Sequence, residues 1–325
     1  MISTFKKRWQ LFSDSIDTAD PNIYSQGQKF RFYLQFLIMR IFAGTYMIDY
    51  LQYKFYEKNR YGRKRFIEYQ RLHKIMDIAN APEKNIIFDS KMLFNQRFSK
   101  FLGREWLSIK DSSYNEFLDF LKRNKRIFVK PEIGSFGDGV AIIEYDQDRE
   151  YHDVYEKLIA TESIVEGIVS QTKELAEFNE SSLNTLRIVT LIDKTGKSRV
   201  MFALLRVGRK GKIADNFHHE GIAAKVDLET GIVNTTGINR NFTRYTIHPD
   251  SKKPIVGFEI PKWKELLDFA IELSRQVPET RYVGWDIAIN EQGQPICIEG
   301  NRGADPDVTQ VTDKEGKYYA IMELL

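Results

Sequence analysis

The sequence predicts an α+β protein, because its helical and strand-like patterns occupy different parts of the chain. From about residue 5 to 80, aromatic and aliphatic residues recur three or four positions apart, as in Tyr50, Tyr53 and Tyr56, which is typical of helices. From about residue 126 onwards, short apolar runs bounded by turn residues dominate, which is typical of strands.

The elements after residue 80 are predicted from caps, periodicity and turns. A helix is expected over the stretch DSKMLFNQRFSKFLG, with Asp89 or Ser90 as its cap, and another over residues 113–123. A third helix is expected over residues 261–277, with Pro261 in its first turn. Strands are expected in the stretches RIFVKP, VAIIEY, SIVEG, TLRIVTLID, RVMFALLRVG, AKVDLETGIV, VGWDIAI and ICIEGN.

The composition is that of a globular protein with a sizeable core. The chain has 325 residues, of which 42% are hydrophobic and 29% are charged. Cys297 is the single cysteine, so no intrachain disulfide can form and nothing indicates an oxidising compartment. The N-terminus has no apolar stretch typical of a secretory signal, and we therefore expect a cytoplasmic protein.

The most apolar stretch runs from Phe30 to Tyr50. Arg31, Arg40 and Asp49 interrupt it, so its uncharged runs are far shorter than the roughly 20 residues that cross a bilayer. No transmembrane segment is therefore expected. A buried helix is the main interpretation, and a helix lying on a membrane surface, which would make the protein peripheral, is the alternative.

Charge is distributed unevenly along the chain. Residues 1–130 contain 25 Lys and Arg and 13 Asp and Glu, whereas the remainder is net negative. A basic N-terminal part could attract an anionic substrate or a membrane surface, or it could be a solvated basic face. No helix-turn-helix, zinc-finger or RNP pattern occurs in the sequence, so nucleic acid is not an expected partner.

A polar cluster ends the last two predicted strands. If Gln292-Gly293 forms a two-residue hairpin loop, Asp286 lies directly opposite Glu299. Strand alternation would place Glu299 on the same face as Cys297 and Asn301.

Two facing carboxylates repel each other unless a cation neutralises them. Asp286, Glu299 and Asn301 offer only oxygen ligands, which suits Mg²⁺ better than zinc. We therefore expect a magnesium site on this hairpin. The alternative is an exposed hairpin whose acidic side chains face water.

A lysine and a glycine-rich loop form a second candidate site. Lys130 closes a predicted strand. The loop that follows contains Gly134, Ser135, Phe136, Gly137 and Gly139. Glycines let backbone N–H groups approach a phosphate, and the lysine could reach the same anion. A Walker A or dinucleotide loop would lead into a helix, and the sequence contains no H-R-D or D-F-G triplet of a protein kinase. The pattern indicates either a lid over a nucleotide or a simple hairpin turn.

Taken together, the two sites resemble those of the ATP-grasp superfamily of carboxylate–amine ligases. The stretches SLNTLRIVT, LLRVGRKGKIADNFHHEGI and GWDIAI with IEGNRGADPD are most similar to the sugar-transfer-associated ATP-grasp proteins, and the resemblance covers roughly residues 85–310. It implies an α+β ATP-grasp core of two lobes with ATP and Mg²⁺ as cofactors. The implied divisions are a helical region over 1–84, a lobe with the glycine-rich lid over 85–165, and a lobe with the metal site over 166–325.

The resemblance also implies roles for further residues. Lys91 stands where such ligases place an earlier nucleotide lysine. The stretch SIVEGIVSQ is similar to the hinge strand that receives the adenine, which implies nucleotide contacts at Val165, Glu166, Gly167 and Ile168. The chain departs from the family pattern in its helical first 80 residues and at His219-Glu220-Gly221, where many relatives carry paired glycines.

Two arginines and a histidine-containing loop complete the candidate site. Arg187 and Arg206 lie in apolar strands, where a guanidinium needs an anionic partner. That partner is either a phosphate or acyl-phosphate oxygen, or an internal Asp or Glu. In the stretch DNFHHEG, Asn216 and His218 resemble donors near the transferred phosphoryl group. His218 is either a general base or a structural histidine.

The function expected from these features is ATP-dependent joining of a small-molecule carboxylate to an amine, through an acyl phosphate. The resemblance implies surface polysaccharide or glycoconjugate synthesis, in which an amino acid is joined to a uronic acid or amino sugar. The alternatives are a catalytically silent nucleotide-binding regulatory or scaffold protein, and a peripheral membrane protein.

Overall fold

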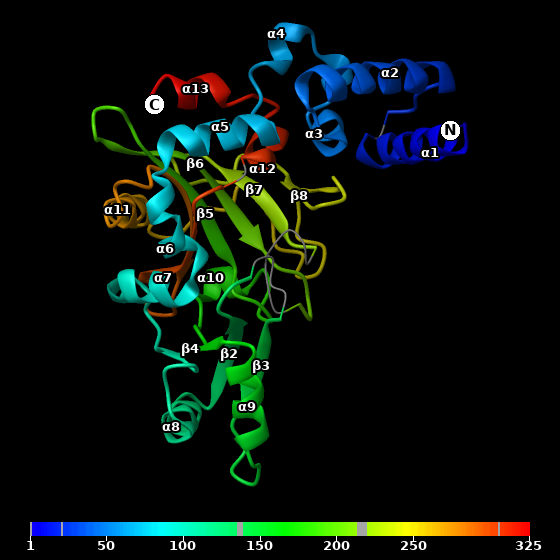
Figure 1. Cartoon of the computed structure of the whole chain (residues 1–325). Coiled ribbons are helices and arrows are strands. Elements are labelled where there is room, and N and C mark those ends of the chain that lie inside the picture. The colour runs from blue at the N-terminus through cyan, green and yellow to red at the C-terminus, as the bar shows by residue number, and fades with distance from the viewer. Residues whose placement is uncertain (1, 21, 135–138, 213–219, 305) are drawn as a thin grey trace.

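The computed structural model of the chain describes residues 2–20, 22–134, 139–212, 220–304 and 306–325. Two antiparallel sheets form its centre, and helices cover them (Figure 1). The small sheet has the strand order β1-β4-β2-β3, and the large sheet has the order β11-β10-β5-β6-β7-β8-β9. Mixed helices and antiparallel sheets confirm the predicted α+β class.

The first 80 residues are helical, as predicted. The helices are α1 (Ile2–Ala19), α2 (Gln26–Ala43), α3 (Met47–Gln52), η1 (Phe55–Glu57), α4 (Arg60–Arg63) and α5 (Tyr69–Ala79). Helix α2 begins at a capping box formed by Ser25 and Gln28, and it ends at Gly44, whose φ of 68° is the left-handed conformation that glycine adopts without strain. Helices α1 and α2 lie side by side and project away from the sheets (Figure 1).

An aromatic cluster holds the N-terminal helices together and joins them to the large sheet. Phe12, Phe32, Tyr50 and Phe55 are buried in it, and they share the cluster with Leu204 of the sheet. No helix in the part of the chain that the structure describes has both the length and the apolar character to cross a bilayer. The predicted burial of the Phe30–Tyr50 stretch is correct for only one face of α2, because five of its large apolar residues are exposed.

The small sheet carries the predicted lysine. Its strands are β1 (Trp106–Ser108), β2 (Arg126–Pro131), β3 (Ala141–Glu144) and β4 (Ser163–Gly167). Helices α8 (Tyr114–Asn124) and α9 (His152–Ala160) pack on it through a core that includes Phe117, Leu121 and Tyr155. The helix predicted over 113–123 is α8, and Ser113 caps it; the sequence reading did not predict α9.

The large sheet carries the predicted hairpin. Its strands are β5 (Thr185–Ile192), β6 (Ser198–Val207), β7 (Ile222–Val226), β8 (Gly237–Ile238), β9 (Arg244–Tyr245), β10 (Tyr282–Ile289) and β11 (Pro295–Asn301). Helix α11 (Trp263–Ser274) covers one face. It begins two residues after Pro261, because Lys262 adopts a left-handed φ of 53° that a helix cannot continue; the expectation of Pro261 in the first turn is therefore wrong.

Short helices complete the two lobes. They are η2 (Pro82–Lys84), α6 (Asn85–Asp89), α7 (Lys91–Arg97), η3 (Ser99–Phe101), α10 (Lys173–Ala176), α12 (Asp307–Asp313) and α13 (Tyr318–Met322). The predicted cap at Ser90 is present, because its hydroxyl accepts a hydrogen bond from Leu93 N. The predicted single helix after it is divided into α7 and η3.

The chain passes from the small sheet to the large one immediately after β4. Thr172 N donates to Ile289 O at 3.1 Å, and Glu291 N donates to Ser170 O at 3.0 Å. Residues 168–172 therefore leave one sheet and pair with the end of β10 in the other. This is the connection expected of a hinge between two lobes.

Candidate functional site

The hairpin β10–β11 brings Asp286 opposite Glu299, as predicted. The loop is different: Asn290 N donates to Gln294 O, so the loop has three residues, Glu291 to Gly293, and the expected two-residue loop is wrong. A bulge next to Asp286 inserts Ile298 and restores the predicted pairing.

The bulge changes which side chains share a face. Cys297 pairs with Ile287, whereas Glu299 pairs with Asp286, the next residue on the same strand. Neighbouring residues on a strand point to opposite faces. Cys297 is therefore buried in the core beneath the sheet and does not share the face of Glu299 and Asn301, which corrects the prediction.

Asp286 is paired with two arginines. Arg187 binds both of its carboxylate oxygens through Nε and Nη2, and Arg206 Nη1 donates to Oδ2 at 2.8 Å. Of the two alternatives left open for these arginines, the internal ion pair is the one present. Burial disfavours the charged carboxylate, but the attraction of Arg187 and Arg206 outweighs it and holds the pKa of Asp286 below its usual range.

The side chains on this face of the hairpin offer oxygen atoms, the ligand type that a hard divalent cation binds. Asp286 is buried, Glu299 is exposed, and Asn301 donates to Glu299 Oε1 through its amide nitrogen, which keeps its carbonyl oxygen available as a ligand. Both arginines bind Asp286, so the repulsion between the two carboxylates from which the metal was predicted is already relieved without a cation. Among the described residues there is no group of three or more His, Cys, Asp or Glu side chains that could hold a metal ion. A Mg²⁺ ion at these residues would therefore need further oxygen ligands, such as those of a phosphate.

Lys130 is held by Glu166 of the neighbouring strand. Its Nζ donates to Glu166 Oε2 at 2.7 Å, while Arg104 Nη2 and Asn95 Nδ2 donate to Oε1 at 2.9 and 3.1 Å. Glu166 is 3% exposed. Its burial favours the neutral acid, but Arg104 and Lys130 hold its pKa below the usual range, so the side chain is a buried anion.

Sequence reasoning missed Arg104, which connects the two sheets. Besides Glu166 of β4, it donates to Cys297 O at 2.8 Å and Ile298 O at 3.1 Å in β11. The planar guanidinium has several N–H donors, so it can donate hydrogen bonds to several acceptors at once. No periodicity or motif marks Arg104 in the sequence; the one available signal is a charged residue directly after Gly103 and ahead of an apolar strand.

Lys91 lies between the two predicted sites. It begins α7, and its Nζ donates to Gly134 O at 3.0 Å and Glu132 O at 3.4 Å. Burial lowers the pKa of Lys91, and the nearby carboxylate of Glu299 opposes that fall. The ammonium of Lys91 thus interacts with Glu299 of the β10–β11 hairpin and contacts the start of the glycine-rich loop.

Only part of the predicted lid lies within the described residues. Ser135, Phe136 and Gly137 lie outside them, as do Asn216 and His218 of the histidine-containing loop. Gly139 has a φ of 74°, and a Cβ there would lie 2.8 Å from Pro131 Cγ, so this turn requires glycine. The loop begins after β2 and ends before β3, which are paired, as the prediction of a hairpin requires.

The predicted hinge residues have different environments. The side chain of Val165 is fully buried in the core beneath the small sheet, so only its backbone faces the neighbouring strands. Gly167 N donates to Glu105 O, and a Cβ on Gly167 would lie 2.7 Å from Asn124 Oδ1. Ile168 follows β4 and is 40% exposed. Ile168 is therefore the hinge residue whose side chain is accessible.

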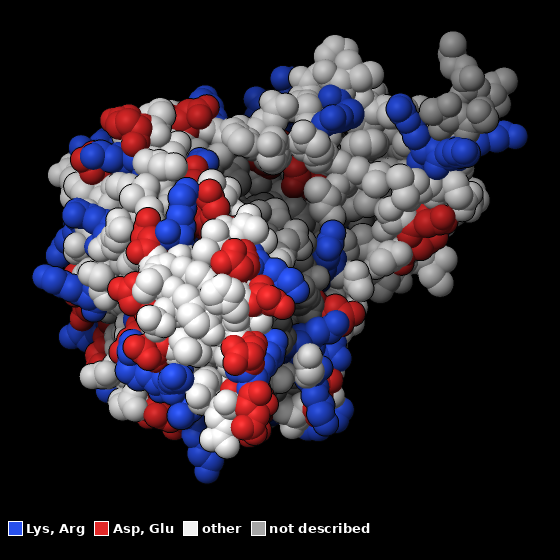
Figure 2. Space-filling model, turned by 60° about the horizontal axis from the view of Figure 1, so that its bottom comes forward, with Lys and Arg blue, Asp and Glu red and all other residues white. Residues whose placement is uncertain are grey.

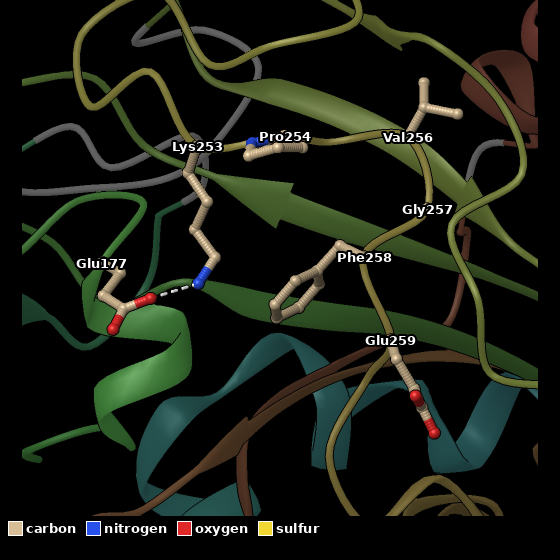
Figure 3. A pocket seen from close by; sticks show the side chains of 7 residues that line it. All are labelled: Glu177, Lys253, Pro254, Val256, Gly257, Phe258 and Glu259. Atoms are coloured by element: carbon tan, nitrogen blue, oxygen red, sulfur yellow. Dashed lines mark hydrogen bonds and ion pairs between the residues drawn. The ribbon is translucent and has the colours of Figure 1, made fainter.

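A separate hollow lies on the large lobe and contains none of these residues (Figure 3). Its lining consists of Glu177, Lys253, Pro254, Val256, Gly257, Phe258 and Glu259. Lys253 is paired with Glu177 and lies over the rings of Phe178 and Phe258, at 5.2 and 5.0 Å from their centres. Its charge is already engaged, so the hollow offers no obvious anion site.

One protein-family model covers most of the chain. Residues 73–321 match the model of the sugar-transfer associated ATP-grasp family. A comparison with curated protein sequences gave no match.

Several solved structures are similar to part of this chain. The ATP-grasp ligase PsnB, complexed with minimal precursor, Mg and ADP, is 14% identical over 75% of this chain and 61% of its own, with a TM-score of 0.46. D-alanyl-alanine synthetase A from Vibrio cholerae O1 biovar eltor is 10% identical over 75% and 67%, with a TM-score of 0.47. N5-carboxyaminoimidazole ribonucleotide synthetase from Thermotoga maritima is 14% identical over 80% and 57%, with a TM-score of 0.45. The chain thus covers less than two thirds of the length of PsnB.

Proposed function

Because this chain belongs to the sugar-transfer associated ATP-grasp family, we propose that it is an ATP-dependent ligase that joins a carboxylate to an amine. One observation carries the proposal. Asp286 is buried, is bound by two arginines and lies opposite Glu299, and the carboxylate of Glu299 interacts electrostatically with Lys91. Cations and oxygen ligands at one strand end are what transfer of a phosphoryl group requires.

The nucleotide would bind between the two sheets. In the proposal, Lys91 and Lys130 contact the phosphates, and the loop from Gly134 to Gly139, which includes Ser135, Phe136 and Gly137, covers them. The adenine would meet the backbone of Val165, Gly167 and Ile168. The carboxylate of Glu166 is already bound by three donors, so we assign it to holding Lys130.

Asp286, Glu299 and Asn301 would hold Mg²⁺, which when bound screens the charge of the phosphates. Arg187 and Arg206 would stabilise the charge on the transferred group, with Asp286 fixing both guanidinium groups in place. Asn216 and His218 are proposed as further donors at this point, with His218 as a candidate general base.

The proposed reaction has two steps. A carboxylate oxygen of the substrate attacks the γ-phosphorus of ATP and ADP leaves, which gives an acyl phosphate. The nitrogen of the amine then attacks the acyl carbon, phosphate leaves, and the nitrogen loses a proton as the amide forms. Surface polysaccharide or glycoconjugate synthesis, with an amino acid joined to a uronic acid or amino sugar, is the proposed context, and because ATP is consumed we place it in the cytoplasm.

The test is a screen for ADP release over pairs of carboxylates and amines, followed by the mass of the product. With an active pair, Glu299→Gln should lower ADP release by roughly 100-fold or more, because it removes a proposed metal ligand. Glu299 is exposed, so the thermal midpoint should not change.

The matched control is Glu291→Gln, which makes the same change at an exposed position in the loop of the same hairpin and should leave ADP release unchanged. Equal loss in both variants would contradict the assignment of Glu299. ATP binding without acceptor-dependent ADP release would instead indicate a catalytically silent nucleotide-binding protein.

A further inference from the structure

Helix α2 is apolar on two opposite faces, and only one of them is covered. Phe32 and Tyr33 are buried in the aromatic cluster of the N-terminal region, with Phe36 packed beside them. The residues of the other face, which we call the α2 stripe, are Phe30, Leu34, Ile38, Ile41 and Phe42. Each lies three or four positions from another member of the set, so together they form one continuous surface.

The exposure of the α2 stripe is unusual for a helix of this composition. Ile41 and Phe42 are 75% and 83% exposed, and the stripe extends for about 18 Å at 1.5 Å per residue. A helix that is apolar all round is normally buried, and large contiguous apolar patches mark surfaces that other molecules cover.

The charges around the α2 stripe are basic. From residue 26 to 48 the sequence contains Lys29, Arg31 and Arg40 and no Asp or Glu. Arg31 and Arg40 are exposed, although Arg40 also donates to Gly44 O and lies over the ring of Tyr46, whereas Lys29 is paired with Asp17. Helix α1 adds the exposed run Lys6, Lys7 and Arg8 beside the start of α2 (the ring of Trp9 contacts that of Phe30).

From these observations we infer that α2 docks on an anionic phospholipid bilayer, with the stripe inserted at the level of the headgroups. An apolar helix face with basic residues at its margin is the pattern of helices that lie in the plane of a membrane interface. Arginine and lysine side chains next to such a face are attracted to acidic lipids. The helix would lie on the bilayer and not cross it.

Charge favours a bilayer over a second copy of the chain. A two-fold dimer through the stripe would bring the same surface of both copies together, and with it Arg31 and the α1 basic run of each. Like charges at an interface oppose association. An acidic lipid surface supplies the opposite charge.

Membrane docking through α2 leaves the proposed nucleotide site accessible. Helices α1 and α2 project to one side of the large sheet, away from the small sheet that carries Lys130 (Figure 1). On the face of the molecule shown in Figure 2, acidic and basic side chains are interspersed, so that face offers no single sign of charge to a membrane.

The experiment is co-sedimentation of the full chain with large vesicles, either of phosphatidylcholine alone or with one fifth phosphatidylglycerol. We expect binding to the acidic vesicles that weakens in 0.5 M salt, because the attraction is screened. Ile38→Gln with Phe42→Gln should lower the apparent partition coefficient at least roughly ten-fold, because it removes two apolar groups from the stripe.

Two further variants separate the apolar and electrostatic contributions. Lys6→Glu, Lys7→Glu and Arg8→Glu together should also lower binding at least roughly ten-fold, and only to acidic vesicles, without touching the packed faces. Ile78→Gln with Ile247→Gln, two exposed isoleucines outside α2, should bind like the unmodified chain. Circular dichroism checks that each variant is folded.

The inference is wrong if the unmodified chain does not sediment with acidic vesicles above the vesicle-free control. It is also wrong if the stripe variant binds as well as the isoleucine control does. If light scattering shows a dimer that the stripe variant converts to a monomer, and no vesicle binding occurs, the stripe is instead a contact between two copies of the chain.

Discussion

Glu166 is a buried carboxylate that donors from three parts of the chain hold in place. Lys130 comes from β2, Arg104 precedes β1, and Asn95 comes from α7. A buried carboxylate needs both opposite charge and hydrogen bonds. Lys130, which we assign to the nucleotide, therefore also stabilises the fold, because it donates to the oxygen of Glu166 that Arg104 does not reach.

Replacing Lys130 should affect both stability and nucleotide binding. Lys130→Met removes a charge-assisted hydrogen bond to a buried carboxylate, so we expect the free energy of unfolding to fall by about 1.5–3 kcal/mol. Affinity for a non-hydrolysable ATP analogue should fall at least roughly ten-fold, because a phosphate loses a cation. Urea unfolding and calorimetry measure the two effects.

The control for this variant is Lys110→Met in the same lobe. Lys110 pairs with Glu162 at 3.0 Å, but both side chains are exposed, so we expect no measurable change in stability and unchanged affinity. If Lys130→Met binds the analogue as tightly as Lys110→Met does, Lys130 serves only to neutralise Glu166.

At the level of elements, the sequence predicts well what depends on local pattern. The N-terminal helices, α8 and the main strands of both sheets follow from periodicity and caps. The sequence also predicted the pairing of Asp286 with Glu299, but from a two-residue loop that the structure does not contain. A three-residue loop and a bulge at Ile298 shift the register in opposite directions, and neither has a clear signal in the sequence.

Contacts between distant parts of the chain were not predictable from local pattern. Arg104 and Asn95 meet Glu166 only because α7 and the chain after Gly103 pack between the two sheets. In the same way, no local feature of Arg187 and Arg206 distinguishes an internal partner from a phosphate. Asp286 lies directly opposite Arg187 on the neighbouring strand and is also reached by Arg206, which is two strands away.

The glycine between Glu299 and Asn301 is required by the packing of α7 on β11. A Cβ at Gly300 would lie 2.9 Å from the rings of both Phe94 and Trp285. Such contacts are too short, so Gly300→Ala must displace a ring or the strand. The glycine thereby fixes how closely the β10–β11 hairpin approaches the helix that begins at Lys91.

We expect Gly300→Ala to lower the free energy of unfolding by about 1–3 kcal/mol, the cost typical of overpacking a core. Urea unfolding at neutral pH measures it. Gly27→Ala is the matched control, since no atom lies within 4 Å of a Cβ there and alanine is the better helix former. Equal stability of the two variants would mean that the rings beside β11 move at little cost.

Across the molecule, each of the two sheets has, among the described residues, a buried carboxylate that two cations keep charged. Glu166 in the small sheet is held by Lys130 and Arg104, and Asp286 in the large sheet is held by Arg187 and Arg206. Arg104 also bonds to β11, so the charge of Glu166 contributes to the contact between the two sheets. The free energy of unfolding of the molecule should therefore depend on pH.

The direction of that dependence follows from the lowered pKa of Glu166. The folded chain favours the ionised form of Glu166. The contribution of this charge to the free energy of unfolding is therefore fully present at pH values above the ordinary glutamate pKa of about 4.3. As the pH falls below that value, the unfolded chain binds a proton that the folded chain does not. The free energy of unfolding then decreases, by up to about 1.4 kcal/mol per pH unit for this one group.

Comparison with Glu166→Gln isolates this contribution, because every other acidic group is common to both proteins. At pH 7 the variant should be less stable by about 3–5 kcal/mol, since Lys130 and Arg104 lose their anion. Urea unfolding between pH 7 and pH 3.5 should show a constant difference down to about pH 4.5, and a difference that narrows below it. A difference that stays constant throughout would mean that Glu166 has an ordinary pKa in the folded chain, and that the link between the two sheets does not depend on its charge.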